Sequence, residues 1–150
     1  MPTTLESVIV QVRDSLNTIA GLPDFSLSPV HPEIHAQLVA DGKLSWPAVY
    51  LSLASEAPIF EDSDLKKINP SGTSAELMAL VYISASADHP ILEIARKAQL
   101  VKNQVKSLTA TAGLDFYCHC GEVQYDRKEN GAWTAAGIPI ICGAYDFYSS

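Results

Sequence analysis

The chain has 150 residues, of which 47% are hydrophobic and only 18% charged, and its formal net charge is -7. This length predicts a single domain over residues 1–150, with a core large enough to need no disulfide or metal staple. The acidic balance argues against nucleic-acid binding by phosphate neutralisation, and the sequence shows neither an export signal nor an apolar run of the ~20 residues that span a membrane.

An amphipathic helix over residues 4–20 is the first element that the sequence predicts. Thr3 and Glu6 have the spacing of a capping box, and Gly21 supplies a stop. The apolar positions recur at steps of three and four, which places them on one helix face. They are Leu5, Val8, Ile9, Val12, Leu16 and Ile19.

Residues 22–45 are less regular, and within them we expect a short helix, Pro32–Ala40, that ends at Asp41-Gly42. His31 and His35 are four residues apart, a spacing that suits a metal site. Neither an acidic residue nor a thiol is tied to them, so we assign both histidines to cap and surface positions.

Two strands are expected next, separated by a long polar connection over residues 55–74. The first is Trp46–Ala54, with Pro47 at its start, where a missing donor is tolerated. The second, Ala75–Ala85, is apolar on both faces and must be covered on both. One face holds Leu77, Ala79, Val81 and Ile83, and the other holds Met78, Leu80 and Tyr82. We expect the long helix that follows to cover one face, and either the N-terminal helix or a neighbouring subunit to cover the other.

That long helix, His89–Leu108, is the element around which we expect the chain to be organised. Glu93 precedes Lys97 by four residues, the favourable order for an ion pair on a helix. Its apolar stripe follows steps of three and four, with Ile91, Ile94, Ala98, Val101, Val105 and Leu108.

A hairpin is expected to close the chain. Its strands are Phe116–Asp126 and Ala132–Phe147, joined by an Asn130-Gly131 turn. Pro139 in the second of them implies an edge position, a bulge or a break. The predicted order is therefore helix, short helix, strand, long loop, strand, helix, strand, strand.

Cys118, Cys120 and Cys142 are the residues most suggestive of chemistry. On a strand the first two thiols point to one face and His119 to the other, so the three cannot easily share a metal. Cys142 on the paired strand could approach either thiol, which leaves a two- or three-thiol site open. Buried cysteine that acts as a small apolar residue is the commoner case.

Motifs of nucleophilic enzymes and of phosphate-binding loops are missing from the sequence, and its basic residues do not interleave with aromatic ones. An enzyme therefore has no residue-level support, and we predict no catalytic residue, cofactor or metal.

The order of these elements resembles that of the tail-terminator proteins of long-tailed bacteriophages, the group that includes the minor tail protein U of phage lambda. The resemblance is carried by five stretches, which are Leu5–Ala20, Trp46-Pro47-Ala48-Val49-Tyr50-Leu51, Ala75–Ile83, Gly131-Ala132-Trp133 and Tyr145-Asp146-Phe147. An acidic loop lies between the second and third of them. The sequence departs from the family in the extra segment 22–45 and in the last strand around Gly137-Ile138-Pro139.

The resemblance implies an α+β fold in which a mixed or antiparallel four-strand sheet, with a β-β-α-β-β core, packs with the central and N-terminal helices. It also implies a hexameric ring that sits on the finished tail tube, at the head-proximal end of the tail. There the ring halts tube polymerisation and presents the surface for head-tail joining. The implied partners are the chain itself, the tail tube protein, the head-tail connector protein and, in contractile tails, the sheath protein, with DNA only in transit through the bore and no membrane.

Within this hypothesis the polar loop docks on the tube or lines the bore, where its acidic residues would keep DNA from sticking. The loop residues concerned are Glu61, Asp62, Asp64, Lys66 and Lys67. Met78, Leu80 and Tyr82 are the candidate subunit interface. Two alternatives remain, a head-completion or connector ring subunit and a small thiol- or metal-dependent enzyme. A virion protein of this kind is made in the host cytoplasm, where thiols stay reduced.

Overall fold

The computed structural model describes residues 4–59, 72–111, 116–128 and 132–144. Its fold is α+β, which confirms the predicted class. Within these ranges the elements are α1 (Leu5–Leu16), α2 (Pro32–Ala40), β1 (Ala48–Ile59), β2 (Gly72–Ser84), α3 (Pro90–Thr109), β3 (Tyr117–Cys120), β4 (Gln124–Arg127) and β5 (Trp133–Ala144).

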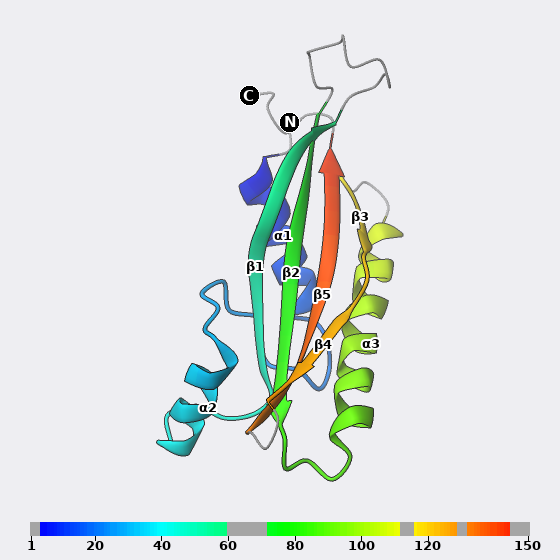
Figure 1. The fold of residues 1–150 in the computed structure, drawn as a ribbon. Helices are drawn as coiled ribbons and strands as arrows, with labels where there is room; N and C mark the ends of the chain where they lie inside the picture. Colours follow the sequence, from blue (N-terminus) through cyan, green and yellow to red (C-terminus); the bar gives the residue numbers. More distant parts are fainter. Residues whose placement is uncertain (1–3, 60–71, 112–115, 129–131, 145–150) are drawn as a thin grey trace.

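The strands form one antiparallel sheet in the order β1-β2-β5-β3, with β4 paired to the same edge of β5 as β3 (Figure 1). The sheet has five strands instead of the predicted four, because the chain leaves the ladder between Cys120 and Gln124 and divides the predicted third strand. β1 and β2 are longer than predicted, since their pairing continues past a register shift at Leu53/Ser55 to Ile59 and Gly72. The connection between them therefore covers residues 60–71 rather than 55–74.

Pro139 lies within a continuous central strand, so the predicted edge position, bulge or break in that strand is wrong. Its carbonyl oxygen accepts a 2.8 Å hydrogen bond from the backbone N–H of Gly121. The N and O atoms of one residue face the same side in an antiparallel strand, so the Pro139 nitrogen faces the edge where β3 and β4 pair. The chain is interrupted there, between Cys120 and Gln124. The pairing is therefore interrupted between β3 and β4 rather than in β5, at the point opposite Pro139, which has no backbone N–H to donate.

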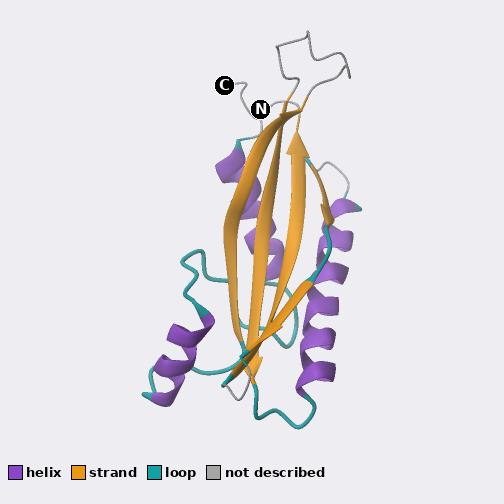
Figure 2. Ribbon diagram, viewed as in Figure 1, coloured by secondary structure: helices purple, strands orange, loops and turns teal. Residues whose placement is uncertain are grey.

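Helices α1 and α3 both lie on one face of the sheet (Figure 2). The two predicted stripes form the main core against that face, with Val8, Val12, Leu16, Ile94, Ala98, Val101 and Val105 buried. The Glu93–Lys97 ion pair is present at 3.0 Å. Thr4 rather than Thr3 caps α1, since its hydroxyl accepts from the Ser7 N–H. α1 ends earlier than predicted because Asn17 caps it and binds the Phe25 N–H through its side chain, which turns the chain back.

α2 lies on the opposite face, over one end of the sheet (Figures 1 and 2). Here Tyr50, Tyr82 and Trp133 form a second apolar cluster with residues of the 22–45 segment. His35 is buried beside Tyr50, with 2.7 Å between its Nδ1 and the tyrosine oxygen, so its predicted surface position is wrong. One of our alternatives was that the N-terminal helix covers this face. It does not, because α1 packs beside α3 on the other face. The 22–45 segment covers one end of it instead.

Candidate functional site

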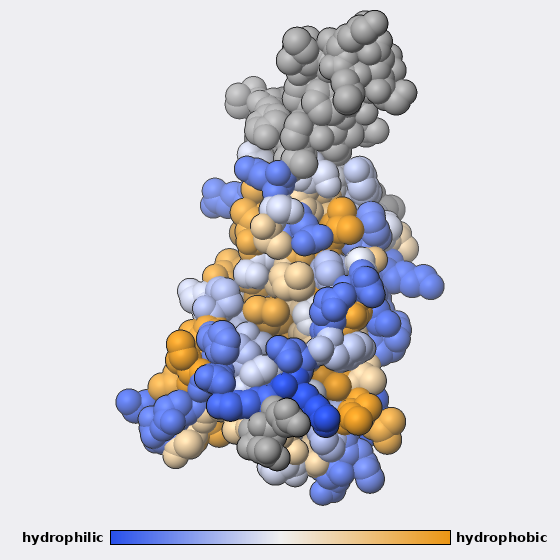
Figure 3. Space-filling model, in the orientation of Figure 1, coloured by the Kyte–Doolittle hydropathy of each residue, from blue (hydrophilic) through white to orange (hydrophobic). Residues whose placement is uncertain are grey.

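The middle of the sheet face opposite α1 and α3 carries apolar side chains that none of the described helices covers. We call this surface the open face and define it by the half-buried residues Met78, Leu80, Gly137 and Ile141, which surround the buried Pro139. In the register Met78 is opposite Pro139, and Leu80 is opposite Gly137. Figure 3 views this side of the molecule, where apolar side chains over the sheet lie among hydrophilic ones. The pattern follows from β2, whose sequence is apolar at both odd and even positions.

Two glycines on this side of the sheet let larger side chains lie against the backbone. A Cβ built on Gly137 would lie 3.3 Å from Met78 Sδ, so the methionine extends over that glycine. The Tyr117 ring lies so close to Gly143 that a Cβ there would overlap it. Tyr117 remains 44% exposed at the margin. A partly exposed apolar surface of this kind favours contact with another protein surface.

The three residues predicted as a subunit interface differ in exposure. Met78 and Leu80 are half-buried on the open face. Tyr82 is only 3% exposed, and its hydroxyl donates a 2.9 Å hydrogen bond to the Val30 carbonyl. Tyr82 is therefore already covered by its own chain. The sequence reasoning missed Ile141, although it alternates with the core residues Ile140 and Cys142 along β5 and could have been found by that signal.

The predicted tube-docking or lumen residues Glu61, Asp62, Asp64, Lys66 and Lys67 lie outside the described residues. The described part of the β1–β2 hairpin pairs as far as Ile59 and Gly72, at the end of the sheet remote from α2 (Figure 1).

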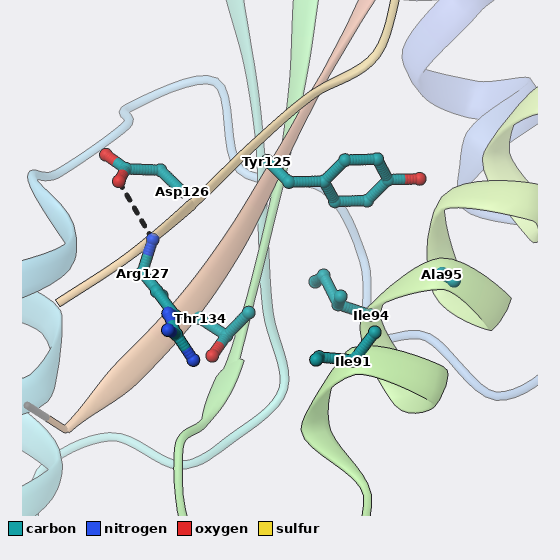
Figure 4. Close-up of a pocket in the computed structure, with 7 residues that line it drawn as sticks. All are labelled: Ile91, Ile94, Ala95, Tyr125, Asp126, Arg127 and Thr134. Atoms are coloured by element: carbon teal, nitrogen blue, oxygen red, sulfur yellow. Dashed lines mark hydrogen bonds between the residues drawn. The ribbon is translucent and has the colours of Figure 1, made fainter. Parts of the chain in front are cut away.

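A second apolar surface is the groove between the start of α3 and β4, with a volume of 540 Å³ (Figure 4). Ile91, Ile94 and Tyr125 point into it, and Arg127 borders it. Ile91 is 71% exposed, so its predicted place in the core stripe is wrong. Ile91 lies in the first turn of α3 at the groove, where Tyr125 and Arg127 of β4 leave it largely exposed.

The three cysteines lie on the helix-covered face of the sheet, and none is in a disulfide. Cys118 is directly opposite Cys142, and both are buried. A hydrogen bond from the Cys142 thiol lowers the pKa of Cys118, and the same contact raises the pKa of Cys142. Burial raises the pKa of Cys120 to about 11. A groove of 480 Å³ between α3 and β3 is lined by Cys118, Cys120 and Thr109 among others.

The histidines and cysteines do not converge on one point. His31 caps α2, as predicted, by accepting from the Glu33 N–H at 3.2 Å. His35 Nε2 lies 3.1 Å from the Ser45 carbonyl, to which it donates. In the part of the chain that the structure describes, no group of three or more His, Cys, Asp or Glu residues is arranged to hold a metal ion. Nor do the described helices include one that is long and apolar enough to cross a bilayer.

Comparison with protein-family models and with curated proteins found no match to this chain.

Proposed function

We propose that this chain is a structural virion protein that closes the completed phage tail tube as a ring, stops tube polymerisation and forms the surface for head-tail joining. The observation that supports it best is the open face, where Met78, Leu80 and Ile141 are left half-buried by the chain's own helices. An uncovered apolar sheet centre, in a chain with only 18% charged residues, favours a protein partner.

A ring requires a head-to-tail contact in which two different surfaces of neighbouring subunits meet. We assign this contact to two surfaces, the open face and the groove between α3 and β4. They lie on opposite sides of the sheet, since the groove is formed with α3 and the open face is not. Subunits that join one surface to the other would close into the hexamer that the family resemblance implies, and closure leaves no site for further growth.

The loop at the end of the β1–β2 hairpin has a separate role in this proposal. It docks on the tail tube protein or lines the bore, where Glu61, Asp62 and Asp64 repel DNA in transit. The opposite face of the ring meets the head-tail connector protein and, in contractile tails, the last sheath ring. The protein is made in the host cytoplasm and resides in the virion, and its role is structural rather than enzymatic.

Electron microscopy of lysates from a phage that lacks this chain tests the proposal. We expect overlong tails without heads, because tube growth is no longer stopped. Tails of normal length without heads would favour a head-completion or connector ring instead, and intact particles would overturn both. Deletion of residues 60–70 tests the loop separately, since normal-length, head-joined tails would exclude docking through it.

The mass of the purified chain in solution, followed by imaging, tests the ring directly. We expect closed rings, either in solution or once tail tubes are added. A compact monomer that never assembles, even at the end of a tube, would contradict the proposal.

A further inference from the structure

We infer that Cys118 of β3 and Cys142 of β5 are an oxidation site, at which an oxidant of the disulfide class joins them in a disulfide inside the subunit. The inference is independent of the proposed virion role. It depends on the register of the two strands, on the burial of the two thiols and on the groove that reaches one of them.

The register places the two cysteines in the kind of strand pair that a disulfide can bridge. Gly121 donates to the carbonyl of Pro139, the residue that the β3–β5 register places opposite it, so this pair is of the hydrogen-bonded type. Pair types alternate along an antiparallel ladder, which makes Cys118 and Cys142 a non-hydrogen-bonded pair. Cα atoms in such pairs are about 4.5 Å apart, within the range that disulfides span.

The third cysteine is placed less favourably. Cys120 lies two residues from Cys118 on the same strand, a separation of roughly 7 Å along the chain, at the limit for a disulfide. Relative to Cys142 it is a diagonal neighbour, also about 7–8 Å away. The fold therefore selects one pairing among the three that the composition allows.

The surroundings give the two thiols different tasks. Cys118 is 2% exposed and lines the groove between α3 and β3, while Cys142 is 0% exposed and does not line it. Thr109 Oγ1 lies 3.3 Å from Cys118 Sγ, and the Cys142 thiol is its other polar neighbour. Both contacts favour the thiolate form of Cys118, the form that attacks disulfides. Cys118 is thus the entry thiol and Cys142 the resolving one.

The reaction is a thiol–disulfide exchange in two steps. The Cys118 thiolate attacks oxidised glutathione, forming a mixed disulfide and releasing one glutathione thiolate. Cys142, after loss of its proton, attacks the Cys118 sulfur and releases the second glutathione. The protein loses two protons and two electrons, and one oxidised glutathione takes them up to become two reduced molecules.

The test is to incubate the reduced, folded full-length chain with oxidised glutathione and to map its disulfides without reduction. Trypsin separates Cys142, in peptide 129–150, from the other two cysteines, in peptide 107–127. We expect the intact mass to fall by two hydrogen atoms and the two peptides to be joined. Fragmentation of the joined peptides should place the bond at Cys118.

Single variants complete the design. Cys120→Ser is the matched control and should retain the joined peptides, whereas Cys118→Ser and Cys142→Ser should lose them. Were a serine variant to fail to fold, fragmentation of the wild-type peptides would still identify the bonded residues. Persistent glutathione adducts, a bond at Cys120, or no mass change in the wild type would each overturn the inference.

Discussion

The hydroxyl of Tyr82 in β2 donates a 2.9 Å hydrogen bond to the carbonyl of Val30, fifty-two residues earlier in the chain. This contact ties the segment before α2 to the sheet. It divides the face opposite α1 and α3 into an end that the chain covers itself and a centre, the open face, that it leaves uncovered. Burial raises the pKa of Tyr82 to about 12, so the hydroxyl remains a donor at neutral pH.

Replacement of Tyr82 by phenylalanine tests that contact. Tyr82→Phe keeps the ring in the cluster with Tyr50 and Trp133 but leaves the Val30 carbonyl without its donor. We expect the free energy of unfolding in urea to fall by about 1 kcal/mol. Tyr125→Phe is the control, since that residue is 52% exposed, and it should change stability by less than ~0.5 kcal/mol. Equal losses in the two variants would contradict this account of Tyr82.

The position of Pro139 leads to a second prediction, which compares two sites on one strand. Pro139→Ala adds an N–H opposite the gap between β3 and β4, so we expect unfolding free energy to change by no more than about 1 kcal/mol. Ile141 faces the same edge, where the register makes it a hydrogen-bonded partner of His119. Ile141→Pro should therefore cost at least about 2 kcal/mol, because the His119 carbonyl loses its donor.

Urea unfolding of both variants measures the difference. A tolerated proline at position 141, or a large loss from Pro139→Ala, would show that the interruption between β3 and β4 is not what accommodates the native proline.

The sequence predicts an element of this fold well where local contacts determine it and poorly where contacts with distant parts of the chain do. The stripes of α1 and α3 depend on local periodicity and were predicted to within a few residues. The exposure of Ile91 was not predicted, because periodicity places this residue on the apolar face of the helix but does not show how much of that face its neighbours cover. Pro139 is likewise accommodated in β5 because the pairing stops between β3 and β4. The sequence of β5 alone does not reveal this interruption.

The open face was likewise predicted where local pattern determines it and not where long-range contacts do. The two-faced apolar pattern of β2 predicted that Met78 and Leu80 need cover beyond the long helix. It did not show that His35 and Tyr50 dock α2 over one end of that face, because a single buried histidine leaves no periodic signal. Tyr82 therefore lies beneath the 22–45 segment of its own chain, although it shares a strand face with Met78 and Leu80.

The ring proposal gives a third prediction, for the open face. Met78→Asp places a charge at the centre of this face, where it stays accessible to water in the single subunit but is buried in a ring. We expect ring formation to be lost while circular dichroism remains that of the folded chain. Gln99→Asp adds the same charge on the exposed side of α3 and should leave rings intact. Rings that form equally well with Met78→Asp would exclude the open face as the contact.

The fourth prediction concerns pH and the Cys118 thiol. The hydrogen bond from Cys142 lowers the pKa of Cys118, whereas burial raises that of Cys120 to about 11. Lys102 and Lys106 of α3 and His119 line the same groove. Because the thiolate is the reactive form, alkylation of Cys118 by iodoacetamide should reach half its maximal rate at a lower pH than alkylation of Cys120.

Mass spectrometry of the two cysteines after alkylation at a series of pH values gives both midpoints. Cys142→Ala removes the thiol that stabilises the Cys118 thiolate, so the midpoint of Cys118 should move to higher pH. Cys120→Ala should leave it in place, because Cys120 is not among the groups that lower the Cys118 pKa. A Cys118 midpoint that does not respond to Cys142→Ala would show that the two thiols do not share a proton across the β3–β5 pair. The contact with Thr109 would then be the remaining cause of a lowered Cys118 pKa.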